Sequence, residues 1–301
     1  MMISNLEQTL KAGKFTITAE IGPPKSCNVD FVRQKAELLR GLVAACNLTD
    51  NQTAIVRMSS IAAARIIEDM GIETVVQMTC RDRNRIGLQS DILGLAALGI
   101  KNLVCLTGDH QTFGNHPEAK NVFDLDAVQL IHTAHLMNEG KFLCGEEIKV
   151  PPRIFIGCVE NPFADPFAFR VTRLQKKVRA GARFCQTQCV LDQERFNRFM
   201  ELAVTEGVTD ECHILAGIMP LKSARVARYM KTQVAGMSVD NAIIQRLEAA
   251  SEPAQEGINI AVEQVQAMMN IKGVAGVHIM AVAWEDAIPE IIKRSGLHHE
   301  C

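Results

Sequence analysis

The feature that most constrains the fold is an alternation, repeated eight times, of short segments with strand character and longer segments with helical periodicity. It extends over nearly all of the 301 residues. A βαβα order predicts a parallel sheet, and eight such units in about 250 residues or more fit a closed (β/α)8 barrel. We therefore expect an α/β fold of the TIM-barrel type. A doubly wound open sheet is the alternative.

The expected strands and helices alternate along the chain, with a long connection, His110–Asn121, after the fourth strand. The strands are Phe15–Ile21, Val43–Thr49, Thr74–Thr79, Leu103–Asp109, Arg153–Val159, Arg183–Gln188, His213–Ile218 and Gly276–Val282. Helices are expected over Val29–Leu42, Met58–Met70, Asp124–Asn138 and Asp192–Glu206, with others ending near Leu98, Gly181 and Gly296. Two or three extra helices occupy residues 222–271, between strands seven and eight. Because no linker or low-complexity segment interrupts the pattern, we expect one domain over residues 1–301.

Composition excludes several classes of partner. A formal net charge of −2 gives no reason to expect nucleic acid or an acidic membrane surface. No apolar run is long enough to span a bilayer, and the first residues lack the basic and apolar regions of a signal peptide. We therefore expect a cytoplasmic protein with no membrane partner. The ten cysteines are scattered without a CxxC pair, which is typical of structural thiols in a reducing compartment.

Polar side chains gather toward the carboxyl ends of the expected strands. In Phe15–Ile21 the apolar residues alternate with Thr16, Thr18 and Glu20, and Pro23 and Pro24 end the strand. Taking alternate positions on the other strands adds Asn47, Thr49, Gln77, Thr79, Cys105, Thr107, Asp109, Gln186 and Gln188. The carboxyl end of a parallel barrel is where active sites are built. We therefore expect a ligand with many hydrogen-bonding edges to bind across this end.

Each residue also has a plainer interpretation. Glu20 can be a strand-end carboxylate facing solvent, and Asp109 after Gly108 can be a turn residue. On the helix after strand five, Arg170, Arg173 and Lys177 share one face. This face is either solvated or contacts phosphate, with Asp165-Pro166 at the expected helix start.

Metal binding is not expected. His110 and His116, in the long loop after strand four, and the tail His298-His299-Glu300-Cys301 are poor ligand motifs. We interpret both as surface features.

Several short motifs occur in an order that resembles the methylenetetrahydrofolate reductase family. They are Ala19-Glu-Ile-Gly-Pro-Pro24, Met78-Thr-Cys80, Leu106-Thr-Gly-Asp109, Lys176-Lys-Val-Arg-Ala-Gly-Ala182, Thr187-Gln188 and Gly217-Ile-Met-Pro220. The resemblance covers nearly the whole chain. It implies a flavin-dependent barrel that reduces 5,10-methylenetetrahydrofolate to 5-methyltetrahydrofolate in one-carbon metabolism.

The resemblance also implies roles for individual residues. Glu20 matches the general acid that promotes opening of the folate's five-membered ring. Asp109 matches the carboxylate between flavin and pterin, which contributes to catalysis and holds the folate. Gln188 matches a residue that hydrogen-bonds the pterin, and Thr49 and Lys177 match flavin contacts. The flavin carries the redox step, while the protein supplies orientation and proton transfer.

At some positions this sequence departs from the common bacterial pattern. Gln77, Thr107, Asn161 and Arg170 stand at flavin positions where the pattern has His, Arg, His and Asp, respectively. FAD is the cofactor that the resemblance implies, and these four changes make FMN the alternative. Near Ala224 the family often has a Phe that stacks on nicotinamide. Its absence favours ferredoxin or a partner redox subunit over NAD(P)H as the electron donor, and we expect an oligomer.

Two rival functions remain open from the sequence. One is a pterin-binding barrel that transfers methyl groups without redox chemistry. The other is a non-catalytic barrel subunit of a redox complex.

Overall fold

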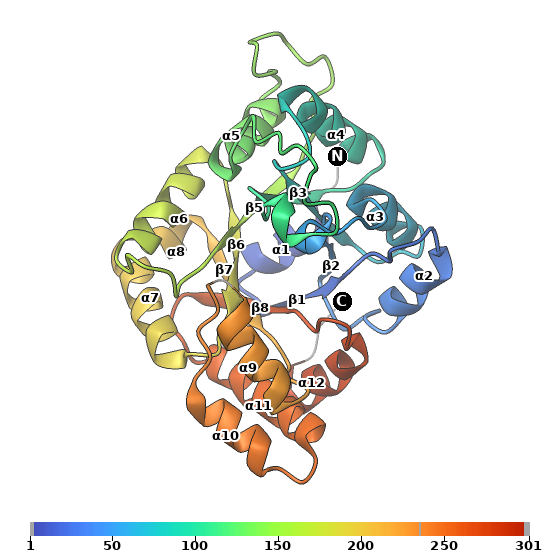
Figure 1. The fold of residues 1–301 in the computed structure, drawn as a ribbon. Helices are drawn as coiled ribbons and strands as arrows, with labels where there is room; N and C mark the ends of the chain where they lie inside the picture. Colours follow the sequence, from blue (N-terminus) through green and yellow to red (C-terminus); the bar gives the residue numbers. More distant parts are fainter. Residues whose placement is uncertain (1–2, 235, 298–301) are drawn as a thin grey trace.

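The computed structural model describes residues 3–234 and 236–297. Eight parallel strands close into a barrel in sequence order, and β8 pairs with β1 to complete it. Helices surround the strands on the outside (Figure 1). The closed barrel is thus confirmed, and the open sheet is excluded. The strands are β1 Thr16–Ile21, β2 Ala45–Leu48, β3 Thr74–Thr79, β4 Asn102–Leu106, β5 Phe155–Glu160, β6 Phe184–Cys189, β7 His213–Ile218 and β8 Val274–Ile279.

The helices follow the strands in the expected order. They are α1 Asn5–Lys11, α2 Val29–Glu37, α3 Ser60–Glu68, α4 Arg85–Ala97, α5 Ala127–Asn138, α6 Phe169–Ala180, α7 Gln193–Thr205, α8 Val208–Glu211, α9 Ala224–Gln233, α10 Asn241–Ala249, α11 Pro253–Met268 and α12 Ile288–Ser295. Single 3₁₀ turns lie at η1 Gln52–Ala54, η2 Gln111–Phe113 and η3 Glu285–Ala287. The region between β7 and β8 therefore holds three helices, α9 to α11.

The strands are buried on both faces, as expected for a barrel covered by helices. On β1, Ile17, Ala19 and Ile21 belong to the apolar layer between barrel and helices, while Thr16 and Thr18 lie on the other face of the strand. The alternation expected for this strand is confirmed. Its polar face lies inside the barrel, where Thr18 is in register with His278 of β8.

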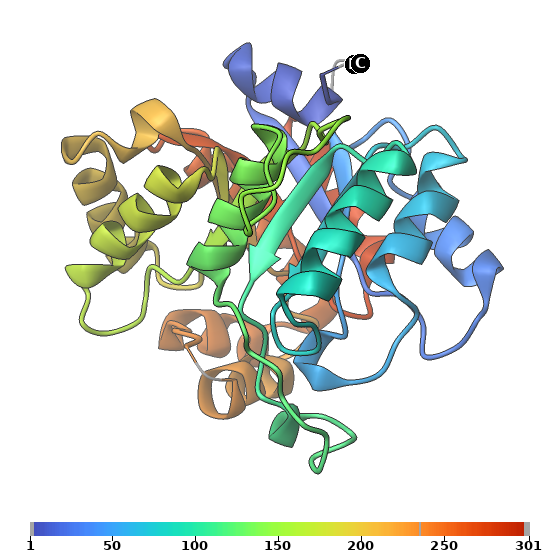
Figure 2. The ribbon, with the colours of Figure 1, turned by 90° about the horizontal axis from the view of Figure 1, so that it is seen from above.

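The amino-terminal helix α1, which the sequence pattern did not predict, closes one end of the barrel (Figure 2). Leu6 and Leu10 are fully or almost fully buried against the interior residues Phe155 and Phe184. The carboxylate of Glu73 accepts hydrogen bonds from the backbone N–H groups of Asn5 and Leu6, at 2.6 and 2.9 Å. A carboxylate at this position satisfies free N–H groups and the positive end of the helix dipole. The barrel floor is therefore apolar and sealed.

Above this floor lies a layer of hydrogen-bonded polar side chains. Thr18, Asn47, Gln186 and His278 are all buried and belong to four different strands. Between floor and layer, Gly157 leaves room for the ring of Phe184, because a Cβ there would lie 2.3 Å from that ring. The stacked rings of Phe155 and Phe184 are 4.9 Å apart. The interior is thus apolar at one end and polar toward the other.

Some sequence expectations were wrong in detail. β4 ends at Leu106, so Asp109 lies in the following loop, and Cys105 packs in the outer apolar layer while Val104 faces inward. α6 begins at Phe169 rather than at Asp165-Pro166, and its first residues have no side-chain cap. α2 ends at Glu37, five residues earlier than expected, because the chain turns there. The tail from His298 to Cys301 lies outside the described residues.

Candidate active site

A cavity of about 420 Å³ opens at the carboxyl ends of the strands. Its volume is within the roughly 300–1,000 Å³ that is typical of small-molecule sites. α9, α10 and the loop between β4 and α5 project at this end, opposite α1 (Figure 2). Of the nine residues to which the family resemblance assigns a place in the site, seven line it: Glu20, Gln77, Thr107, Asp109, Asn161, Lys177 and Gln188. Of the predicted site residues, Thr49 and Arg170 lie off this wall.

Glu20 lies near the end of β1 with its side chain 11% exposed. Gln77 Nε2 donates to its Oε2 at 3.2 Å, and Gln52 Nε2 donates to its Oε1 at 3.4 Å. The imidazole Nε2 of His278 is 3.9 Å from Oε2. Glu20 therefore faces the cavity within a set of polar side chains, and the interpretation as a solvated strand-end carboxylate is wrong.

Sequence reasoning missed Gln52 and His278. Gln52 is in the loop after β2, where three residues that are not glycine have positive φ: Asn51, Thr53 and Ala54, at 46°, 57° and 56°. Such backbone is strained and persists only where surrounding contacts hold it. No local sequence pattern predicts the positive φ values of this loop. His278 had a weak signal, since it is the single ionisable residue within an otherwise apolar strand.

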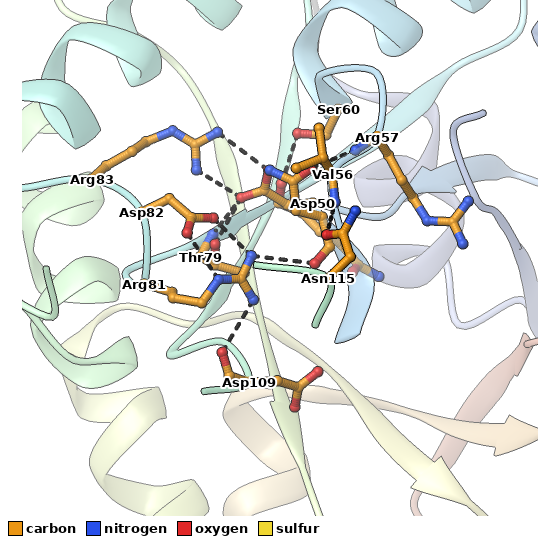
Figure 3. A network of polar contacts seen from close by, with 12 residues as sticks. Asp50, Val56, Arg57, Ser60, Thr79, Arg81, Asp82, Arg83, Asp109 and Asn115 are labelled. Carbon is orange, nitrogen blue, oxygen red and sulfur yellow. Dashed lines mark hydrogen bonds and ion pairs between the residues drawn. The ribbon is translucent and has the colours of Figure 1, made fainter. Parts of the chain in front are cut away.

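Asp109 is held by its backbone, which leaves its carboxylate free. Its carbonyl oxygen accepts from Arg81 Nη1 at 3.2 Å, and Arg81 also donates to the backbone of Asn51 and to the carboxylate of Asp82. Figure 3 shows the Asp109 carboxylate pointing away from Arg81. The Arg81 side chain is 3% exposed. Through these hydrogen bonds, its guanidinium connects the loops after β2, β3 and β4 at the cavity rim.

A second buried ion pair fixes the adjacent part of the wall. Both oxygens of Asp50 accept from Arg83, at 2.7 and 3.2 Å, and Asp50 Oδ2 also accepts from the backbone N–H and the hydroxyl of Thr79 (Figure 3). Arg83 also forms an ion pair with Asp91 of α4. Thr79 is thereby held rigidly beside Gly108, whose φ of 94° and close approach to the Thr79 side chain both favour glycine.

On the helix after β5, the predicted basic face is divided. Lys177 and Arg170 are buried, and Lys177 Nζ forms an ion pair of 2.7 Å with Glu160 Oε2. Arg170 approaches the other oxygen of Glu160 at 3.9 Å. The solvated interpretation is wrong for these two residues. Arg173 is exposed and lines the cavity, so both interpretations stay open for it. The expected helix start at Asp165-Pro166 is wrong, since α6 begins at Phe169, and the Asp165 carboxylate pairs with Arg195.

Near the cavity, Thr49 Oγ1 and Asn47 Oδ1 are buried and have no hydrogen-bond partner among the residues that the structure describes. Buried polar atoms are normally paired, so each such atom needs an explanation such as a ligand or water. The Gln188 amide oxygen accepts from the backbone of Cys189 at 3.0 Å, so its Nε2 can bond a ligand. The donors and acceptors therefore fit a flat heterocycle with polar edges, which is what a flavin or a pterin presents.

The model of the methylenetetrahydrofolate reductase family matches residues 5–296. The chain belongs to this family. A "Methylenetetrahydrofolate reductase 2" of Schizosaccharomyces pombe is 29% identical over 251 residues, which cover 79% of this chain and 38% of that protein. A "5,10-methylenetetrahydrofolate reductase" of Pectobacterium carotovorum is 24% identical over 76% of each chain. This member of the family thus spans less than half the length of the yeast relative.

Among solved structures, a Clostridium thermocellum protein described as binding two copies of 5-methyl-5,6,7,8-tetrahydrofolic acid superposes with a TM-score of 0.68. The superposition covers 96% of this chain and 97% of the Clostridium thermocellum chain, and the two sequences are 14% identical. At that identity the likeness shows the fold.

Further features of this methylenetetrahydrofolate reductase family member concern the residue near the expected nicotinamide position, metal ligands and membrane-spanning helices. Ala224 is the first residue of α9 and packs in an apolar cluster under that helix. In residues 3–234 and 236–297, no cluster of His, Cys, Asp or Glu is arranged to hold a metal ion. None of the helices described there is both long and apolar enough to cross a membrane. His110 and His116 are exposed, as expected.

The cysteines of the described chain are all free thiols, and seven of them are buried. Cys158 and Cys185 are in register on β5 and β6. Hydrogen bonds from the thiols of Cys185 and Cys212 hold the pKa of Cys158 well below its usual range. Cys27 and Cys144 are exposed.

Proposed function

We propose that this protein is a flavin-dependent methylenetetrahydrofolate reductase, which converts 5,10-methylenetetrahydrofolate to 5-methyltetrahydrofolate. The observation that carries the proposal is the placement of Glu20, Asp109 and Gln188 on the wall of one cavity at the carboxyl end of the barrel. Family membership supports the same reaction. The three side chains come from β1, from the loop after β4 and from β6.

Glu20 is the residue that we propose as general acid. It sits on a wall that also carries amide groups able to orient a pterin, and its own position is fixed from two sides by Gln52 and Gln77. Opening the five-membered ring of the substrate requires a proton at nitrogen before the one-carbon unit can accept hydride. A fixed carboxyl group close to that nitrogen delivers the proton without diffusion.

Asp109 and Gln188 are proposed to hold the pterin. The free carboxylate of Asp109 accepts hydrogen bonds from N–H groups of a pterin or flavin edge, and Gln188 Nε2 donates to a ring acceptor. Because the Asp109 backbone is anchored by Arg81, its carboxylate is positioned before any ligand arrives. Preorganisation of this kind lowers the entropic cost of binding.

A flavin fits the remaining residues, and when bound it supplies the hydride that reduces the folate. We propose that Thr49, Gln77, Thr107 and Asn161 hold its ring and ribityl chain, with Asp109 at one edge. The unpaired Thr49 hydroxyl supports this assignment. Lys177, which lines the cavity, and Arg170, which lies off its wall, are proposed to act together with the buried Glu160, because both approach that carboxylate.

The phosphate end of the flavin is proposed to meet Arg173. This guanidinium is exposed, lines the cavity and has no hydrogen-bond or ion-pair partner in the part of the chain that the structure describes. A single free cation suits the one phosphate of FMN as well as the first phosphate of FAD. We retain FAD as the cofactor that family resemblance implies and FMN as the alternative.

Electron supply is proposed to come from ferredoxin or a partner redox subunit, since Ala224 offers no ring on which nicotinamide can stack. We further propose that the chain is a single cytoplasmic domain that acts as an oligomer and takes folate as its small-molecule partner.

An absorption spectrum of the purified protein, with mass spectrometry of the released cofactor, tests the proposal. The expected result is a yellow protein with one flavin per chain, reoxidised by methylenetetrahydrofolate after chemical reduction. A colourless protein that cannot be reconstituted with FAD or FMN would contradict it and would favour a pterin-dependent methyltransferase or a non-catalytic subunit.

A further inference from the structure

The buried histidine of β8 lies directly beneath Glu20. His278 is 2% exposed, and its ring joins β8 to β1 through Nδ1, which is 2.9 Å from Thr18 Oγ1. Its other nitrogen, Nε2, is 3.9 Å from Glu20 Oε2. Burying an imidazole inside a barrel costs free energy unless both ring nitrogens have polar partners. The contacts proposed above for the substrate and the flavin do not include His278.

The polar layer fixes which nitrogen carries the proton. Asn47 Nδ2 donates to Gln186 Oε1 at 2.8 Å, so the amide of Gln186 turns its Nε2 toward the histidine. That Nε2 lies 3.4 Å from both His278 Nδ1 and Thr18 Oγ1. An amide nitrogen only donates, and a hydroxyl that accepts from it is free to donate onward. Nδ1 is therefore the acceptor of the chain, and the proton of a neutral ring sits on Nε2, which faces Glu20.

The two oxygens of Glu20 are consequently not equivalent. Oε2 has the Gln77 amide at 3.2 Å and the histidine Nε2 beside it, whereas Oε1 has only the longer contact of 3.4 Å from Gln52. Donors directed at Oε2 leave Oε1 as the oxygen that is free to hold a proton. Hydrogen bonds at catalytic groups are often long without substrate and shorten in the complex.

We propose that His278 is a positioning residue for Glu20, which holds Oε2 through Nε2–H and directs the proton-bearing Oε1 toward the substrate. This inference rests on the proposed function and assigns His278, which lines the cavity, a role that it exerts through Glu20. In the step itself, the proton moves from Glu20 Oε1 to a ring nitrogen of the folate, that nitrogen's bond to the one-carbon unit breaks, and the carboxylate that remains is stabilised by the donors at Oε2.

The test separates the two half-reactions by stopped flow. Enzyme reduced with dithionite is mixed with methylenetetrahydrofolate, and flavin reoxidation is followed by absorbance. Leucine at position 278 removes the donor, so His278→Leu should slow reoxidation by up to about 10²-fold, as expected when a reacting group is misplaced. Glutamine places an amide nitrogen close to the position of Nε2, so His278→Gln should recover most of the rate. A merely structural histidine would not give this rescue.

Controls keep the result specific. The dissociation constant for folate and the flavin spectrum should stay close to the wild-type values in His278→Gln, and His213→Gln, at the opposite end of the barrel, is the matched control for histidine replacement. Thr18→Val removes the hydroxyl that orients the ring and should give a smaller slowing.

The outcomes are distinguishable. If wild-type enzyme is not reoxidised by methylenetetrahydrofolate, the proposed function and this inference both fall. If wild type reacts and His278→Leu reacts equally fast, or if His278→Gln is as slow as His278→Leu, only the role of His278 is overturned. Equal rates for Thr18→Val and wild type would overturn the assigned tautomer.

Discussion

Lys177 Nζ lies 2.7 Å from Glu160 Oε2, and both side chains are at most 4% exposed. This ion pair joins α6 to the end of β5, and both of its residues line the cavity. Lys177 also donates to the carbonyl of Val159, a residue of the wall itself. Lys177, which we propose as a flavin-site residue, thus also supports the barrel.

Replacing Lys177 with methionine should destabilise the protein by about 3–5 kcal/mol, because Glu160 would be left as a buried charge with only the distant Arg170. The additional change Glu160→Gln should recover part of this loss. Urea unfolding of the two single variants and the double variant measures the coupling. Simple addition of the two single effects would show that the pair contributes no coupling energy.

Gly157 should be intolerant of a side chain. An added Cβ would lie 2.3 Å from the ring of Phe184, which cannot move within the packed floor of the barrel. We expect Gly157→Ala to cost about 1–3 kcal/mol, the usual range for overpacking. Gly94, inside α4 with open space around it, is the matched control, and Gly94→Ala should be neutral or stabilising. Equal unfolding midpoints for the two variants would contradict the proposed crowding.

Glu20→Gln should slow the folate half-reaction by about 10²- to 10⁴-fold, the usual contribution of a general acid. Reduction of the flavin should continue, because that step takes no proton from Glu20. Stopped-flow measurement of both half-reactions decides the matter. If Asp109→Asn abolishes reoxidation while Glu20→Gln does not affect it, the acid has been assigned to the wrong carboxylate.

Stability should fall in mildly acidic solution through His213. Burial, aided by Lys11, lowers the pKa of His213 below its ordinary value of 6.5. The unfolded chain therefore takes up a proton near pH 6.5 that the folded chain does not, and stability decreases as the pH falls through that value. The melting temperature of His213→Gln should accordingly depend less on pH between 7.5 and 5.5 than that of wild type. Parallel curves would rule out His213 as a source of the effect.

The sequence was informative where local pattern and fold agree. β3 and β7 were predicted with the bounds that they have. β3 is rich in β-branched residues, and β7 is a short, mostly apolar run. The inward face of β4 was assigned wrongly, since Val104 and Cys105 are both buried and alternation carries no information in a strand covered on both sides.

The site residues that belong to sequence motifs could be predicted, whereas the residues that hold them in place could not. Glu20, Asp109 and Gln188 stand at strand ends or just beyond them, and the topology brings such positions together. The ion pair of Glu160 with Lys177, by contrast, depends on the angle at which α6 packs. The contact of Gln52 with Glu20 depends on a strained loop that no local pattern predicts.

The sealed floor of the barrel has a consequence for how the chain folds during synthesis. Leu6 and Leu10 precede every strand of the barrel in the chain, yet the side chains that bury them include Phe155, Phe184 and Leu215. Their docking surface is complete only after more than two-thirds of the 301 residues have left the ribosome. Until then α1 is a short helix with exposed leucines, and segments of this kind are prone to aggregate or to bind chaperones. The helix that closes the barrel is therefore made before the strands that it covers and docks late.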